Sequence, residues 1–175
     1  MMNDEQNALH PIHRSSFKSV PMSLFAKAMY RALVWKERQR ALRGEQPDKK
    51  GKASGRAAHL VTGERGETLA YWHLRQEGYT IVARNRRSRG GELDLIGWDG
   101  PTLAFVEVKT RTTADTGPPE LAVSRTKQKR IARAAHDYLR HLRNRPESYR
   151  FDIVSVFWDQ AAGLRVRLIK NAFTT

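Results

Sequence analysis

The sequence predicts an α/β fold in which a mixed central β-sheet is flanked by helices, with the elements in the order α-β-β-β-α-β-β. Two observations lead to this prediction. Short apolar runs rich in β-branched and aromatic residues are bounded by turn residues, which is typical of strands. Longer segments repeat apolar residues every three or four positions, which is typical of helices. Helices interleaved with strands in this order favour a mixed sheet covered by helices.

The predicted elements follow one another closely from residue 62 onward. A helix is predicted over 62–77, with Thr62 as its N-cap and Gly78 as its stop. A strand over 79–84 (YTIVAR) is followed by a loop over 85–91 (NRRSRGG). The remaining predicted elements are strands 92–98 and 103–110 joined by a turn at Asp99-Gly100, a loop over 111–123, a helix from 124 to about 144, and strands 150–158 and 164–170.

Residues 1–61 differ in composition from the rest of the chain, and we predict that they form a basic, largely flexible extension of a domain that covers 62–175. Polar runs around prolines in this part are typical of linkers. Apolar residues at near-helical spacing over 22–43 are interleaved with lysines and arginines, which indicates a basic amphipathic helix. The segment 44–56 (GEQPDKKGKASGR) is predicted to be flexible.

The chain has 175 residues, no cysteine and a net charge of +14. A surplus of this size indicates a polyanionic partner, nucleic acid first and an anionic membrane surface second, although many basic proteins are simply well solvated. The lack of cysteine excludes disulfides, thiolate nucleophiles and cysteine zinc sites. No apolar run approaches the roughly 18 residues that cross a bilayer, and the polar N-terminus lacks the apolar core of a signal peptide. We therefore expect a cytoplasmic protein without membrane insertion.

Three charged residues stand within segments that otherwise have the pattern of buried strands. Asp94 lies in GELDLI, and Glu107 and Lys109 lie in FVEVKTR. Side chains alternate along a strand, so Glu107 and Lys109 point the same way about 6.7 Å apart. Burying such charges is costly unless a metal ion or an opposite charge neutralises them. Two acids and a lysine on stiff strands suit a magnesium-dependent attack on a phosphodiester, although an ion pair on a half-exposed strand gives the same pattern.

Two further charged residues lie on helix faces that are predicted to be buried. Glu67 stands three and seven residues before Ala70 and Leu74, on the side that packs against the sheet. The alternative is an acid in the first helical turn that stabilises the helix dipole. Lys127 stands four residues before Ile131 and extends the inward stripe of the long helix. Its alternative is a lysine that reaches out to water from a helix start.

Basic residues gather in two places that could hold phosphates. Four arginines fall within six residues of the predicted 85–91 loop and its border, beside two glycines. The helix start around 125–133 is also rich in arginine and lysine, and could follow the backbone of a duplex. Solvated surface charge is the alternative in both places. The residues predicted to contact nucleic acid are Arg84, Arg86, Arg87, Arg89, Arg111, Arg125, Lys129 and Arg130.

Several other chemistries have no matching pattern in the sequence. The six histidines show no HxH or HExxH spacing, so a zinc site is not predicted. No GxSxG, Walker or GxGxxG pattern is present, which argues against a serine hydrolase, an NTPase and a dinucleotide-binding protein.

These motifs together resemble the YraN-like family of bacterial proteins, over residues 62–173. That family is similar to the restriction-endonuclease-like (PD-(D/E)XK) superfamily, which includes archaeal Holliday-junction resolvases and is marked by an aspartate followed by an acid-x-lysine. The first 61 residues lie outside the resemblance. The matching stretches are Gly63-Glu64 through Glu67 and Ala70, Gly78-Tyr79, Asn85-Arg86, GELDLI at 91–96, FVEVKTR at 105–111, the helix start 123–127, Arg150-Phe151-Asp152 and Asn171-Ala172-Phe173.

The resemblance implies a restriction-endonuclease-like core and a metal-dependent endonuclease that hydrolyses DNA, including branched or repair intermediates. It maps Asp94, Glu107 and Lys109 onto the nuclease motif, Glu67 onto an acid of the first helix and Lys127 onto a polar helix residue near the site. One or two Mg²⁺ (or Mn²⁺) ions would then be held by Asp94, Glu107, Glu67 and the Val108 carbonyl, with Lys109 orienting water or stabilising charge on the phosphate.

The nucleic acid, the oligomeric state and the function each have alternatives. The resemblance favours DNA over RNA, and resolvases of this fold suggest a homodimer by analogy alone. A first alternative function is a nucleic-acid-binding protein of nuclease fold that is catalytically silent or depends on a partner. A second is an adaptor at a membrane surface that acts through the basic 22–43 helix.

Overall fold

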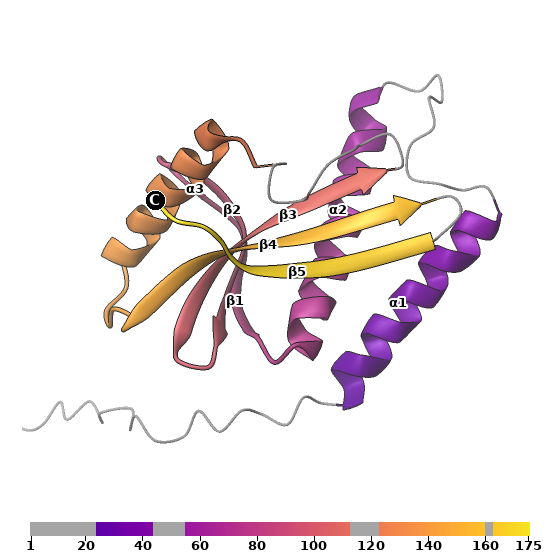
Figure 1. Cartoon of the computed structure of the whole chain (residues 1–175), viewed down its shortest axis with the longest axis horizontal. Helices are drawn as coiled ribbons and strands as arrows, with labels where there is room; N and C mark the ends of the chain where they lie inside the picture. Colours follow the sequence, from indigo (N-terminus) through magenta and orange to yellow (C-terminus); the bar gives the residue numbers. More distant parts are fainter. Residues whose placement is uncertain (1–23, 44–54, 113–122, 160–162) are drawn as a thin grey trace, which may run out of the picture.

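The computed structural model describes residues 24–43, 55–112, 123–159 and 163–175, and within them the predicted order α-β-β-β-α-β-β is confirmed, preceded by one more helix (Figure 1). The elements are α1 (Leu24–Leu42), α2 (Gly55–Gln76), β1 (Thr80–Ser88), β2 (Gly91–Asp99), β3 (Thr102–Thr112), α3 (Arg125–Arg140), β4 (Ser148–Asp159) and β5 (Gly163–Phe173). None of the helices in these ranges is both long enough and apolar enough to cross a membrane.

The five strands form one mixed sheet in the order β1-β2-β3-β4-β5. Neighbouring strands are antiparallel except for β3 and β4, which are parallel. A parallel pair needs a crossover between its strands, and α3 lies in that connection. The tight turns before and after the crossover make the remaining pairs antiparallel, and the predicted mixed α/β class is therefore confirmed.

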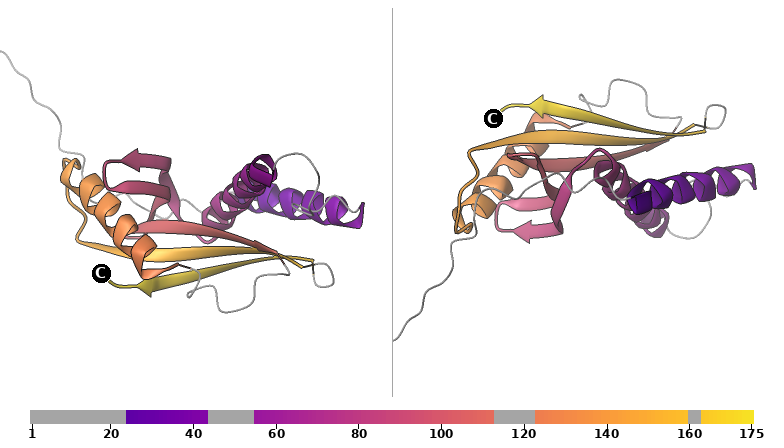
Figure 2. Two further views of the ribbon diagram at one scale, coloured as in Figure 1. Left: turned by 90° about the horizontal axis from the view of Figure 1, so that it is seen from above. Right: turned by 90° about the horizontal axis from the view of Figure 1, so that it is seen from below.

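The sheet carries a hydrophobic cluster on each face because its strand side chains alternate between the faces. One cluster joins α2 to the sheet through Leu69, Leu74, Val106 and Val154, among others. The other joins α3 to the sheet through Ile131, Phe105 and further residues. Figure 2 shows that the β1–β2 hairpin bends out of the plane of the other three strands.

The helices and strands differ from the predicted bounds at several ends. The helix predicted at 62–77 begins at Gly55, so Thr62 lies buried inside α2 and its prediction as an N-cap is wrong. The predicted stop is confirmed: Gly78 has a φ of +94°, and the Tyr79 amide donates to the Leu74 carbonyl at 3.0 Å. The Ser124 side chain accepts a hydrogen bond from the Lys127 amide at the start of α3, which ends at Arg140 rather than near 144.

The loop predicted over 85–91 is largely wrong. β1 continues through Ser88 because Arg86, Arg87 and Ser88 pair with β2, and only Arg89 and Gly90 form the turn. The sequence reads as a loop because polar residues follow each other without alternation. Asn85 has a φ of +48° at this point, which a short polar side chain tolerates better than most. The arginines are thus carried mainly by a strand.

Helix α1 confirms the helix predicted over 22–43 and packs against α2. Glu37 is 5 % exposed and forms ion pairs with Arg40 at 2.8 Å and with Arg65 of α2. Phe25 lies edge-on to Trp72 of α2, with 5.8 Å between the ring centres. Of the segments predicted to be flexible, residues 1–23 and 44–54 lie outside the described residues.

The β1–β2 turn lies directly against α3. A side chain on Gly90 would place its Cβ 2.7 Å from the Ala134 amide nitrogen and 2.9 Å from the Arg133 carbonyl oxygen. Backbone atoms of a helix cannot move aside, so glycine is needed for this close approach. The contact fixes β2, which carries Asp94, relative to α3, which carries Lys127.

Candidate active site

Asp94 and Glu107 lie where the pairing of β2 with β3 ends. The last paired residues on this side are Leu95 and Val106, which are the sequence neighbours of Asp94 and Glu107. Beyond that point the Val108 amide donates a hydrogen bond of 2.7 Å to Asp94 Oδ2. The Asp94 carboxylate therefore accepts a hydrogen bond from a backbone N–H group of β3, and the two acids lie close together on neighbouring strands.

Glu107 is buried between two lysines. Its side chain is 3 % exposed, and its Oε1 lies 2.8 Å from Lys109 Nζ on the same strand. Lys127 reaches it from the first turn of α3, with its Nζ 3.2 Å from Glu107 Oε2. This second contact is an ion pair whose angles do not make a hydrogen bond, so the buried Oε2 has no hydrogen-bond partner. The predicted inward orientation of Lys127 is therefore correct.

Asp94 is held in an environment that disfavours its charged form. Burial raises the pKa of Asp94 to about 7, and the negative charges of Glu107 and, more weakly, Glu67 act in the same direction. The hydrogen bond from Val108 and the ammonium of Lys127 act against this rise. Two like charges are thus held close together without enough positive charge to offset the effect of burial, which is common at functional sites.

Glu67 contributes its charge from α2. Its neighbour Gly66 lies directly against the Thr110 side chain on β3, so this turn of α2 is close to the sheet. Among the described residues, however, no three His, Cys, Asp or Glu side chains lie close enough together to hold a metal ion. The structure therefore brings together Asp94, Glu107, Lys109 and Lys127, while Glu67 acts on Asp94 through its charge.

The donor atoms at this site fit a hard cation. Mg²⁺ binds through one or two carboxylates together with carbonyl and water oxygens. Glu107 offers a buried carboxylate oxygen without a hydrogen bond, and Asp94 is a second carboxylate whose charged form is disfavoured by its surroundings. A cation between them would satisfy both groups.

The arginines that were predicted to form one cluster lie in different surroundings. The Arg84 guanidinium lies over the Tyr71 ring of α2, 4.9 Å from its centre. Arg87 forms an exposed ion pair with Glu92 at 3.3 Å. Arg89 lies in the turn, and the Arg130 backbone lies beneath Gly91 of the hairpin. Arg84 and Arg87 thus contact different partners.

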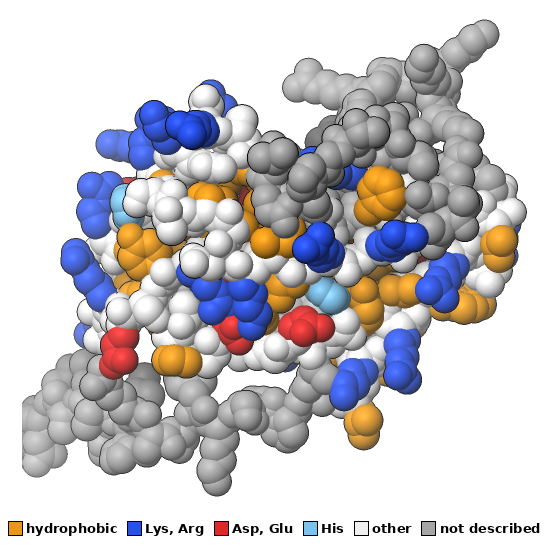
Figure 3. All heavy atoms as spheres, viewed as in Figure 1, with side chains coloured by type: hydrophobic (Ala, Val, Ile, Leu, Met, Phe, Trp, Pro, Cys, Tyr) orange, Lys and Arg blue, Asp and Glu red, His pale blue; other side chains and the backbone are white. Residues whose placement is uncertain are grey.

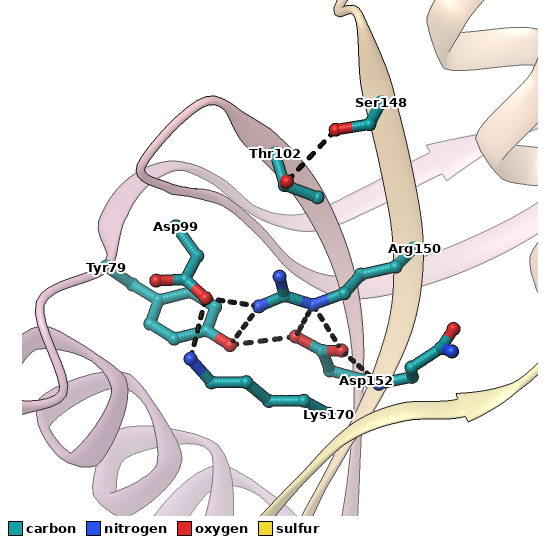
Figure 4. A network of polar contacts seen from close by, with 8 residues as sticks. Tyr79, Asp99, Thr102, Ser148, Arg150, Asp152 and Lys170 are labelled. Atoms are coloured by element: carbon teal, nitrogen blue, oxygen red, sulfur yellow. Dashed lines mark hydrogen bonds and ion pairs between the residues drawn. The ribbon is translucent and has the colours of Figure 1, made fainter.

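A second polar cluster, which the sequence did not predict as a unit, lies near the β2–β3 turn (Figure 4). Asp152 is completely buried and accepts hydrogen bonds from Tyr79 Oη at 2.8 Å and from Arg150 Nε at 2.9 Å. Arg150 also binds Asp99, which Lys170 contacts at 2.7 Å. Burial, followed by the charge of Asp152, raises the pKa of Tyr79, which keeps its phenol protonated as a donor.

This second cluster has a structural role. Its two aspartates face one arginine and one lysine, and the Asn171 amide completes the shell of Asp152 at 2.8 Å. The signal in the sequence was the pair of motifs Arg150-Phe151-Asp152 and Asn171-Ala172-Phe173. Only the fold shows that these motifs meet each other and Tyr79.

Fold and site together define a mixed α/β protein with an acid–lysine centre at the point where two strands of its sheet separate. The model of the uncharacterised protein family UPF0102 matches residues 66–156, a range that includes every residue of this centre. The chain belongs to this family, and the predicted membership of the YraN-like family is confirmed.

Relatives from several bacteria support the assignment. A UPF0102 protein of Koribacter versatilis is 50% identical over 117 residues, which cover 66% of this chain and 80% of the relative. One from Symbiobacterium thermophilum is 50% identical over 111 residues, 63% of this chain and 94% of the relative. One from Geobacter sulfurreducens is 43% identical over 113 residues, 65% and 88% of the two chains.

Proposed function

We propose that this protein is a metal-dependent endonuclease that hydrolyses phosphodiester bonds, with DNA favoured over RNA and Mg²⁺ or Mn²⁺ as the cofactor. The observation that carries the proposal is the buried Glu107 carboxylate, which has one oxygen without a hydrogen bond and stands beside an aspartate whose pKa is raised to about 7. A structural ion pair gains nothing from a second buried acid beside it, whereas a cation site uses both carboxylates.

Each residue of the centre has a distinct proposed role. Asp94, Glu107 and the Val108 carbonyl would hold the cation, which when bound supplies an activated water and offsets charge on the phosphate. Lys109 is 28 % exposed, so its ammonium can contact a phosphate oxygen while it remains beside Glu107. Lys127 forms an ion pair with Glu107 and fixes its orientation from α3. Glu67 adds negative charge that attracts the cation.

The test is a cleavage panel with the full chain and either Mg²⁺ or Mn²⁺. Branched, flapped, single-stranded and linear duplex DNA are compared with the corresponding RNA. We expect cleavage of at least one substrate, and a loss of about 10²–10³-fold for Lys109→Ala because it removes a donor to the developing charge. Lys36→Ala changes an exposed lysine of α1 and serves as the matched control. Cleavage that survives Lys109→Ala, or no cleavage of any substrate, would refute the proposal.

One observation favours a second candidate, a nucleic-acid-binding protein of nuclease fold that is silent or requires a partner. Among the described residues, no three acidic, histidine or cysteine side chains lie close enough together to hold a metal ion. In addition, two lysines already neutralise the charge of Glu107. This candidate predicts nucleic-acid binding without cleavage and without affinity for divalent cations.

A further inference from the structure

Two adjoining cavities, which share His136, run along the outer side of α3. The first has a volume of about 660 Å³ and lies between α3 and the last two residues, and the second has a volume of about 290 Å³ and lies toward β4. We call them together the α3 trough. The residues that line it are Arg125, Gln128, Lys129, Ala132, Arg133, His136, Leu139, Arg140, Arg145, Pro146, Tyr149, Thr174 and Thr175.

The α3 trough is strongly cationic. Arg125, Lys129 and Arg133 follow one another at intervals of four residues, so they form a row along one face of the helix. No acidic side chain lines either cavity, although Arg140 is paired with Asp137 at 2.9 Å. Figure 3 shows lysine and arginine side chains gathered over α3. A row of this kind fits a chain of phosphates rather than a single anion.

An aromatic ring stands exposed at the far end of the trough. Tyr149 is 41 % exposed, and its ring is held edge-on by Phe105 and Phe151, whose centres lie 6.1 and 6.0 Å away. Its hydroxyl lies 3.2 Å from His136 Nε2. The ring is therefore fixed in orientation while part of it faces solvent. A rigid exposed aromatic beside a row of cations is how proteins bind unpaired bases.

The trough starts on the turn of α3 that also carries a residue of the candidate active site. Arg125 at one end and Lys127, which contacts Glu107, belong to the same first turn of α3. The 16 residues of α3 span about 24 Å, which suits the lower end of single-strand site sizes at about 4 nucleotides.

We propose that the α3 trough binds single-stranded nucleic acid, with phosphates along Arg125, Lys129 and Arg133 and a base stacked on Tyr149. Bases of an intact duplex are already stacked on each other, so Tyr149 distinguishes a free strand from a duplex. The route to cleavage rests on the proposed function, and substrates with a single-stranded arm would then be preferred. The binding itself requires neither metal nor cleavage.

The charge part is tested by fluorescence anisotropy of a labelled single strand and its blunt duplex, in the absence of divalent cations. We expect tighter binding of the single strand. Lys129→Gln with Arg133→Gln should weaken it about tenfold, and should reduce the slope of log affinity against log salt by about 1.4, since each lost contact removes about 0.7. Arg165→Gln with Arg167→Gln removes the same charge from exposed positions on β5 and should change both values far less.

The stacking part is tested by Tyr149→Ala and Tyr149→Phe. The phenylalanine variant keeps the ring and should bind the single strand as the wild type does, whereas alanine should weaken binding by about tenfold. Equal affinity for strand and duplex, equal effects of the two double variants, or equal affinity of the alanine and phenylalanine variants would each overturn the proposal. The charge variants keep the test valid if Tyr149→Ala fails to fold.

Binding and cleavage by the wild type separate this inference from the proposed function. Preferential strand binding without cleavage by the wild type would refute the nuclease and leave the trough in place, whereas cleavage without strand preference would refute the trough alone.

Discussion

Replacing Asp94 with asparagine is expected to make the protein more stable at neutral pH while it abolishes cleavage. Surroundings that raise the pKa of Asp94 from 3.8 to about 7 favour a neutral side chain. Asparagine is neutral, and its carbonyl oxygen can still accept the hydrogen bond from the Val108 amide. Since one pKa unit corresponds to about 1.4 kcal/mol, we expect a gain of roughly 2–4 kcal/mol in the free energy of unfolding, the lower part allowing for solvent screening.

The pH dependence of this gain has a defined sign. Below about pH 4 the Asp94 carboxyl is protonated in both the folded and the unfolded chain, so variant and wild type should be equally stable. The difference should develop as the pH rises from about 4 to about 7 and stay constant above that range. Urea unfolding at a series of pH values measures it. An asparagine variant that is less stable than the wild type above this range would contradict the prediction.

Asp99→Asn is a matched control for which the expected change in stability has the opposite sign. Although burial acts to raise the pKa of Asp99, hydrogen bonds from Lys170 and Arg150 hold it below its ordinary value. The folded state therefore gains stability from this carboxylate at neutral pH and loses it as the pH falls through the lowered pKa. The same substitution should then destabilise the protein at neutral pH.

Replacing Asp152 with alanine is expected to give the largest loss of stability of any change considered for this chain. The carboxylate is completely buried and accepts hydrogen bonds from Tyr79, Arg150 and the Asn171 amide. Without this carboxylate Arg150 keeps only Asp99 as an ion-pair partner, and the Tyr79 hydroxyl loses its acceptor; breaking a buried pair costs about 3–5 kcal/mol. Urea or thermal unfolding of the variant checks this value.

Asp137→Ala is the control for that measurement. Asp137 pairs with Arg140 on the surface of α3 at 2.9 Å, and exposed pairs contribute little to stability. We expect a loss well below that of Asp152→Ala for this variant. A loss below about 1 kcal/mol for Asp152→Ala would mean that the second polar cluster does not hold β4, β5 and Tyr79 together.

The sequence was sufficient to predict much of the site but not its surroundings. Strand alternation alone places Glu107 and Lys109 on one face, and helical spacing turns Lys127 inward, so three of the four residues at the centre follow from local geometry. That Asp94 contacts the Val108 amide depends on where the β2–β3 pairing ends, which local patterns do not specify.

Two predicted element bounds were wrong. Residues 85–88 are polar and were predicted as a loop, yet pairing with β2 makes them part of a strand. The start of α2 lies seven residues before the predicted N-cap, in a segment that follows many glycines and polar residues. Contacts distant in sequence decided the first error, and they also explain why the meeting of Tyr79 with Asp152, 73 residues apart, could not be foreseen.

The proposed function depends most on Asp94 and Glu107 acting together as ligands of a divalent cation. Calorimetric titration of the full chain with Mn²⁺, at a pH about one unit above the pKa of Asp94, measures this directly. We expect binding in the millimolar range or tighter, and a loss of at least about tenfold for Glu107→Gln, which removes one carboxylate and little volume. No heat of binding up to about 10 mM, or equal affinity of wild type and Glu107→Gln, would contradict it.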